Sequence, residues 1–114
     1  MIKPTISWND FEKIDMRVGT IIDAQPFEKA KNPAYKLWID FGAEIGIRKT
    51  SAQITVLYAV EELMGKQIVA VVNFPPKQIA DFMSECLVLG VVASDKEVTL
   101  LAPGKKVENG LAIG

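Results

Sequence analysis

The sequence contains no histidine among its 114 residues. This absence excludes Ser-His-Asp and Cys-His nucleophilic catalysis, and it removes the usual imidazole ligands of protein metal sites. The chain also lacks CxxC, HExxH and Gly-x-Ser-x-Gly patterns, so neither a zinc site nor a nucleophile elbow is predicted. We therefore expect a binding protein rather than an enzyme, without a cofactor or a bound metal ion.

Cysteine, net charge and long apolar runs are scarce as well. The single cysteine, Cys86, cannot form an internal disulfide, and its place in an apolar run predicts a buried thiol. The formal net charge is −1, so a nucleic-acid site could only be a local basic patch. The longest apolar run, Leu87 to Ala93, is interrupted by Gly90 and is too short to span a membrane. Since the N-terminus lacks an apolar block, we expect a cytoplasmic protein without membrane insertion.

The most informative segment is the apolar run Ile68–Val72, which ends in an amide, an aromatic ring and two prolines. Four of its five residues are β-branched, as is typical of a strand covered on both faces. Prolines cannot donate to a ladder, so the strand must end near Phe74. Asn73 and Phe74, held at a rigid strand end, are a candidate contact point for a partner. The alternative is structural: Asn73 caps a turn and Phe74 closes the core.

The N-terminal residues predict a short helix. Ser7-Trp8-Asn9-Asp10 matches a capping box, and the spacing of Trp8, Phe11 and Ile14 places them on one face. We expect this helix to seal one end of the core.

Alternating and two-faced apolar segments predict the strands. These segments are Met16–Ile22, where Gly19 predicts a bend or bulge, then Tyr35–Phe41, Ile45–Ile54, Gln67–Phe74, Cys86–Val92 and Val98–Leu101, with a short helical segment over Thr55–Met64. The pattern predicts one all-β domain over residues 1–114. Its fold is a five-stranded OB-fold barrel with a short N-terminal helix and a short helical connection between strands 3 and 4.

Two of these strands carry more apolar surface than a small barrel can cover. Ile68–Val72 and Leu87–Val92 are apolar on both faces, whereas most strands of a five-stranded barrel should present one polar face. A second copy of the chain is the simplest cover, so we predict a homodimer.

Cations and aromatic rings alternate near one face of the predicted barrel. Trp38 stands between Lys36 and Asp40 on the outer face of its strand, so we expect a partner, a neighbouring strand or a ligand base to cover it. The nearby cations and amide are Lys29, Lys31, Asn32, Lys36, Arg48, Lys49 and Lys77. OB folds use such faces to bind nucleic acids. The alternative is an ordinary solvated surface.

Five motifs occur in order along nearly the whole chain. They are Arg17-Val18-Gly19-Thr20-Ile21, Pro33-Ala34-Tyr35-Lys36-Leu37, Ser51-Ala52-Gln53-Ile54, Val71-Val72-Asn73-Phe74-Pro75-Pro76-Lys77 and Ser84-Glu85-Cys86-Leu87-Val88-Leu89-Gly90. Together they resemble the tRNA-binding domain appended to some methionyl-tRNA synthetases. The resemblance implies an OB-fold homodimer that binds tRNA mainly through phosphates, with little sequence preference. For one bacterial branch it implies chaperone-like activity in protein export, with unfolded or precursor polypeptides as partners.

The cationic cluster and the resemblance together assign roles to residues. The RNA-binding set is Lys31, Asn32, Lys36, Arg48, Lys49 and Lys77, with Lys36 and Lys49 on phosphates. The pocket for RNA or peptide is formed by Arg17, Gln53, Asn73, Phe74, Ser84 and Glu85. In the alternative function, export chaperoning is primary and RNA binding is incidental, with polypeptide held on apolar surface around Trp38, Phe74 and Phe82.

The chain departs from the family pattern just before Ser84. Similar sequences usually place glycine there, whereas this chain has Ile79-Ala80-Asp81-Phe82-Met83. Asp81 adds a negative charge and reduces backbone freedom, which questions both the loop geometry and its affinity for phosphate.

Overall fold

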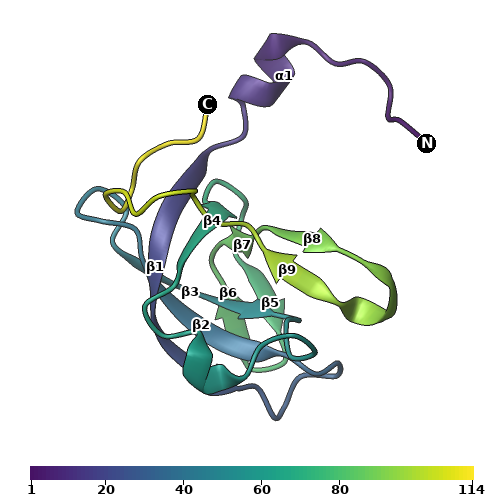
Figure 1. The fold of residues 1–114 in the computed structure, drawn as a ribbon, viewed down its shortest axis with the longest axis vertical. Helices are drawn as coiled ribbons and strands as arrows, with labels where there is room; N and C mark the ends of the chain where they lie inside the picture. The colour runs from purple at the N-terminus through teal and green to yellow at the C-terminus, as the bar shows by residue number, and fades with distance from the viewer.

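Strands dominate the computed structural model, which describes residues 1–114 apart from the side chain of Asp95 (Figure 1). The elements in chain order are α1 (Trp8–Glu12), β1 (Met16–Pro26), β2 (Tyr35–Asp40), β3 (Ile47–Ala52), η1 (Val60–Glu62), β4 (Gln67–Val71), β5 (Lys77–Ile79), β6 (Phe82–Ser84), β7 (Leu87–Val88), β8 (Gly90–Val92), η2 (Ser94–Lys96) and β9 (Val98–Leu100). Within the described residues, no helix has the length and apolar character needed to cross a bilayer.

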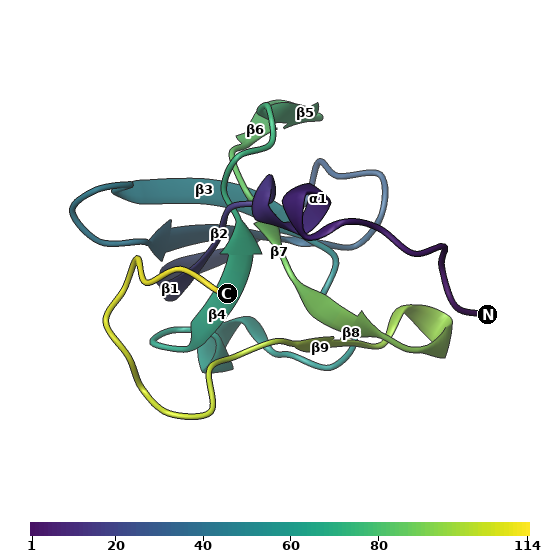
Figure 2. The same cartoon turned by 90° about the horizontal axis from the view of Figure 1, so that it is seen from above.

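The principal sheet is antiparallel and runs in the order β3-β2-β1-β4-β7 (Figure 2). Its central strand, β1, pairs with β4 through its first half and with β2 through its second half. The far edges approach each other where the Glu85 amide donates to the Lys49 carbonyl at 2.8 Å and the Thr50 hydroxyl donates to the Cys86 carbonyl at 2.7 Å. The sheet is thus a nearly closed five-stranded barrel, which confirms the predicted OB-type fold.

The barrel core is made of the inward residues that strand alternation predicts. Leu37, Ile39 and Phe41 are fully buried, together with Ile21 and Ile68. Between β3 and β4, turns and η1 form the expected short helical connection.

Gly19 has a different role from the predicted bend. A Cβ atom there would lie 2.6 Å from Ile39 Cγ2 and 2.7 Å from Phe41 Cδ1, so the glycine leaves room for the core. The irregularity of β1 lies further on, between Ile21 and Asp23, where the register with β2 shifts.

Strand β4 is buried on both faces by its own chain. Ile68 and Ala70 are fully buried, and Val69, Val71 and Val72 are at most 8% exposed. The prediction that this strand needs a second copy as cover is therefore wrong. The other two-faced segment divides into β7 and β8, and there Leu87, Val91 and Val92 remain 49%, 57% and 76% exposed.

The N-terminal helix forms but covers nothing. Its capping box is present, because Ser7 Oγ accepts from the Asp10 amide and Asp10 Oδ2 accepts from the Ser7 amide, both at 3.1 Å. Trp8 is nonetheless 84% exposed, and Figure 1 shows α1 projecting away from the barrel. The prediction that the helix seals the core is wrong. C-terminal residues lie along the start of β1 instead, with the Val18 amide donating to the Leu111 carbonyl at 3.0 Å.

Candidate functional site

The β5–β6 hairpin, absent from the predicted strands, folds over the outer face of β2 and β3. Phe82 is only 6% exposed, and its ring centroid lies 5.9 Å from that of Trp38 and 5.4 Å from that of Phe27. Trp38 is therefore covered by a neighbouring strand, one of the three covers expected for it. The predicted apolar surface around Trp38, Phe74 and Phe82 is wrong for Phe82, and only the Phe74 ring, 53% exposed, remains open.

Two lysines lie on this aromatic cluster. Lys36 Nζ is 5.0 Å from the Phe27 centroid and 5.2 Å from that of Phe82, and Lys49 Nζ is 5.1 Å from the Phe82 centroid. Each distance is within the range of a cation–π contact. No ion pair among the described residues involves either lysine. The hairpin thus holds two adjacent positive charges that keep their hydrogen-bond donors.

The Asp81 carboxylate is paired with a third lysine, Lys29, whose Nζ donates to it at 3.0 Å. This hydrogen bond lowers the pKa of Asp81. This ion pair joins the β1–β2 loop to the tip of the hairpin. It also partly neutralises the negative charge of Asp81, a residue that the family pattern does not have at this position. Ala80 provides the turn, with a φ of 52°, a conformation that glycine adopts more readily.

Ser84 and Glu85 close the barrel at the free edge of β3. The Ser51 amide donates to Ser84 Oγ at 2.9 Å, and the Lys49 amide donates to Glu85 Oε1 at 3.1 Å. Arg48 Nη1 donates to the Val72 carbonyl at 2.6 Å. Three of the predicted site residues therefore connect strands through their polar atoms.

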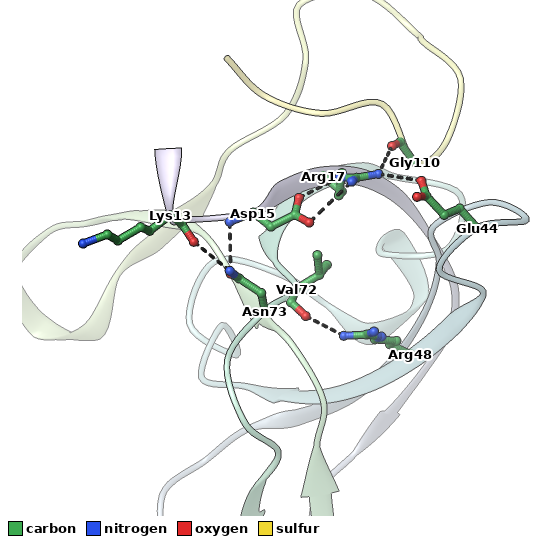
Figure 3. A network of polar contacts seen from close by, with 8 residues as sticks. All are labelled: Lys13, Asp15, Arg17, Glu44, Arg48, Val72, Asn73 and Gly110. Carbon is green, nitrogen blue, oxygen red and sulfur yellow. Dashed lines mark hydrogen bonds and ion pairs between the residues drawn. The ribbon is translucent and has the colours of Figure 1, made fainter. Parts of the chain in front are cut away.

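Asn73 and Arg17 make further structural contacts, which Figure 3 shows. The Asn73 amide group accepts from the Asp15 amide at 3.0 Å and donates to the Lys13 carbonyl at 2.7 Å. This arrangement favours the alternative in which Asn73 serves the fold. Arg17 pairs with Asp15 at 2.7 Å and with Glu44 at 3.1 Å, and the hydrogen bond to Asp15 is the main cause of its raised pKa.

Two grooves meet at Phe74 and collect most of the remaining predicted residues. The first, which we call the hairpin groove, has a volume of about 630 Å³, and its lining includes Lys31, Asn32, Gln53, Phe74, Lys77 and Ser84. The second has a volume of about 570 Å³, and its lining includes Arg48, Asn73, Phe74 and Glu85. Arg17 lines neither groove, whereas Lys36 lies opposite Ser51 of the hairpin groove in the β2–β3 register.

The hairpin groove also has an apolar wall that motif analysis missed. Ile79, Val88 and Val98 line it beside Cys86, and the two-faced apolar run after Glu85 is the sequence signal that could have indicated it. Cys86 is only 8% exposed, which confirms the predicted buried thiol, and this burial raises the pKa of the thiol to about 12. In the described part of the chain, no cluster of three or more His, Cys, Asp or Glu side chains could hold a metal ion.

The chain is similar to known proteins in both sequence and fold. A family model described as a putative tRNA binding domain matches residues 16–112. Methionine–tRNA ligases of Clostridium perfringens and Methanococcoides burtonii are 37% and 36% identical over 91% and 97% of this chain. The chain spans only 16% of the length of each of these two relatives.

Two solved structures match this chain over their whole length. The chaperone CsaA from Bacillus anthracis is 49% identical, with a TM-score of 0.93 over 97% of this chain and 100% of its own. The CsaA chaperone protein from Picrophilus torridus is 53% identical, with a TM-score of 0.90 over 96% of this chain and 100% of its own. The motifs Asn73-Phe74-Pro75-Pro76 and Ser51-Ala52-Gln53-Ile54 also resemble CsaA, and the structural match bears this out.

Proposed function

Because this chain belongs to the family described as a putative tRNA binding domain, we propose that it binds tRNA mainly through phosphates. The observation that carries the proposal is the pair Lys36 and Lys49, whose ammonium groups lie on the ring of Phe82. Contacts to phosphate give affinity that is independent of sequence. Two fixed cations at neighbouring points match the repeating charge of an RNA backbone.

The hairpin groove would accept the nucleotides next to these phosphates. Lys31 and Lys77 are exposed at its lining, and the exposed amides of Asn32 and Gln53 can meet base edges or ribose hydroxyls. The Phe74 ring offers a stacking surface, which is worth about 1–3 kcal/mol per base in single-strand binding. In this proposal Arg48, Ser84 and Glu85 position β3 and the hairpin, and they do not contact RNA.

The test is tRNA binding by fluorescence anisotropy at increasing salt. We expect log K to fall linearly with log salt concentration, and Lys36→Glu with Lys49→Glu to weaken binding at least about tenfold. Lys3→Glu with Lys96→Glu is the matched control, because it changes net charge equally at exposed positions that do not line the groove. Binding that is absent, or that does not respond to salt, contradicts the proposal.

A second candidate function is the binding of unfolded or precursor polypeptides in export. It is favoured by the apolar wall of the hairpin groove and by the exposed apolar side chains of Phe74, Leu87 and Val92, and the two solved CsaA structures above are those of chaperones. Apolar burial is not screened by ions, so this binding should persist at high salt. The measurement is suppression of client aggregation by the wild type and by Phe74→Ala. A wild type that protects no client at equimolar amounts eliminates this function.

We further propose that the protein acts in the cytoplasm as a homodimer. The support for a dimer is the exposed apolar surface of the N-terminal arm and α1, where Ile6, Trp8 and Ile14 are 65%, 84% and 42% exposed. Two copies would present two sets of lysines to one folded RNA, which raises avidity without new contacts.

A further inference from the structure

A third groove lies apart from the candidate site, where the C-terminal segment crosses the barrel. We call it the C-terminal groove, and its volume is about 840 Å³. Gln67 fixes the crossing segment, because its side chain donates to the Val107 carbonyl at 2.7 Å and accepts from the Val107 amide at 3.1 Å. The Thr20 hydroxyl donates to Asn109 Oδ1 at 2.7 Å. Side-chain hydrogen bonds therefore hold this wall in place.

The lining of this groove is positively charged. Lys66, Lys105 and Lys106 line it, and all three are exposed. No carboxylate in the described part of the chain forms an ion pair with any of them. Among the described side chains, the only acidic residue of the lining is Asp40, whose Oδ1 accepts from the Gly42 amide at 2.8 Å. Three ammonium groups against one carboxylate favour an anionic ligand.

The uncharged part of the lining favours a ligand larger than a bare anion. Ile22 is 41% exposed and lines the groove together with the ring of Tyr58 and the aliphatic side chain of Leu100. The Tyr58 hydroxyl accepts from the Leu100 amide at 2.9 Å, which leaves its own proton free to donate. A volume of about 840 Å³ is in the range of small-molecule sites and far exceeds one phosphate group.

We propose that the C-terminal groove binds a nucleoside phosphate, either free or at the end of an RNA strand. The lysines hold the phosphate, Ile22 and Tyr58 face the base, and the Asp40 carboxylate accepts from a ribose hydroxyl. Carboxylates recognise ribose in this way in dinucleotide-binding folds. The proposal uses none of the residues assigned to tRNA binding, so each stands if the other fails.

The test is an NMR titration of the ¹⁵N-labelled protein with 5′-AMP. We expect saturable shifts of the Gln67, Val107 and Asn109 amides, with the amides of Ser51 and Phe74 unmoved. Lys105→Gln with Lys106→Gln should weaken binding about fivefold or more, since two cationic contacts are removed. Lys3→Gln with Lys96→Gln removes the same charge elsewhere and should leave the affinity unchanged.

Three further probes decide the ligand class and its source. Adenosine and inorganic phosphate should each bind at least about fivefold more weakly than 5′-AMP, because each lacks one half of the contacts. A 5′-phosphorylated RNA trinucleotide that binds more tightly than 5′-AMP assigns the groove to RNA ends, and the reverse order assigns it to free nucleotides. Absent shifts at Gln67 and Val107, equal affinity for adenosine or phosphate, or equal losses in both double variants overturn the proposal.

Discussion

At the scale of single residues, Asn73 changes most between sequence and structure. Its position at a strand end predicts either a partner contact or a turn cap, and its amide binds the backbone of Lys13 and Asp15, which favours the structural role. We expect Asn73→Ala to destabilise the fold by about 1 kcal/mol, as for a lost hydrogen bond, and to speed amide exchange in the α1–β1 connection. Affinity for tRNA should stay within about twofold, a small fraction of one base contact. A tenfold loss of tRNA affinity with unchanged amide exchange would instead indicate that Asn73 contacts the RNA.

Cys86 gives a prediction about pH. Burial raises the pKa of its thiol to about 12 in the folded protein, from an ordinary value of 9.0. Above pH 9 the thiol of the unfolded chain ionises while the folded one does not, so stability should fall between pH 9 and 12. Urea denaturation of the wild type and of Cys86→Ala measures this. The wild type should lose up to about 1.4 kcal/mol per pH unit more than the variant, and parallel profiles would contradict the burial of the thiol.

At the scale of elements, the turn of the β5–β6 hairpin holds an L-residue in the left-handed backbone region. Ala80 has a φ of 52°, which costs an L-residue about 1–2 kcal/mol relative to the right-handed region. Ala80→Gly should therefore raise the free energy of unfolding by about 0.5–1 kcal/mol, after the entropy that glycine loses on folding. Ala43→Gly, at an exposed turn position without a positive φ, is the control and should be neutral or destabilising.

The same hairpin shows where sequence reasoning stops. Strand β2 and the first part of β1, Met16–Ile22, could be predicted because the pattern extends over six or more residues, although β1 continues to Pro26. β5 and β6 have three residues each, too few for a period, and their turn lacks the glycine that normally signals it. The contact between Phe82 and Trp38 depends on this hairpin, so it could not be predicted from the sequence.

The candidate site was predictable in composition more than in arrangement. Lys31, Asn32 and Lys77 of the predicted RNA-binding set line one groove with Gln53 and Phe74 of the predicted pocket. The side chains of Ser84 and Glu85 instead accept hydrogen bonds from backbone amides at the edge of β3. These amides need side-chain partners because the strands that close the barrel there are short. The sequence did not predict a shared site for Lys105, Lys106 and Lys66, because only the folded chain brings them to the same groove.

At the scale of the whole molecule, the exposed N-terminal arm predicts association. Light scattering at micromolar concentration should give the mass of two chains. Ile6→Ser with Trp8→Ser should shift the equilibrium toward monomer, because Ile6 and Trp8 are 65% and 84% exposed and leave no cavity when replaced. Val56→Ser with Leu57→Ser, at 55% and 46% exposed, controls for lost apolar surface alone. A wild type that runs as a monomer would remove the proposed dimer.

The cover that Phe82 places over Trp38 also gives the molecule two optically distinct probes. Trp8 and Trp38 are its only tryptophans, and one stands 84% exposed on the arm while the other lies half-buried beneath the hairpin. In the single chain, acrylamide should quench the emission of Trp8 first, and the residual blue-shifted emission should come from Trp38. Arrival of a partner at the arm and of a ligand at the hairpin can therefore be followed as separate fluorescence signals in the unlabelled protein.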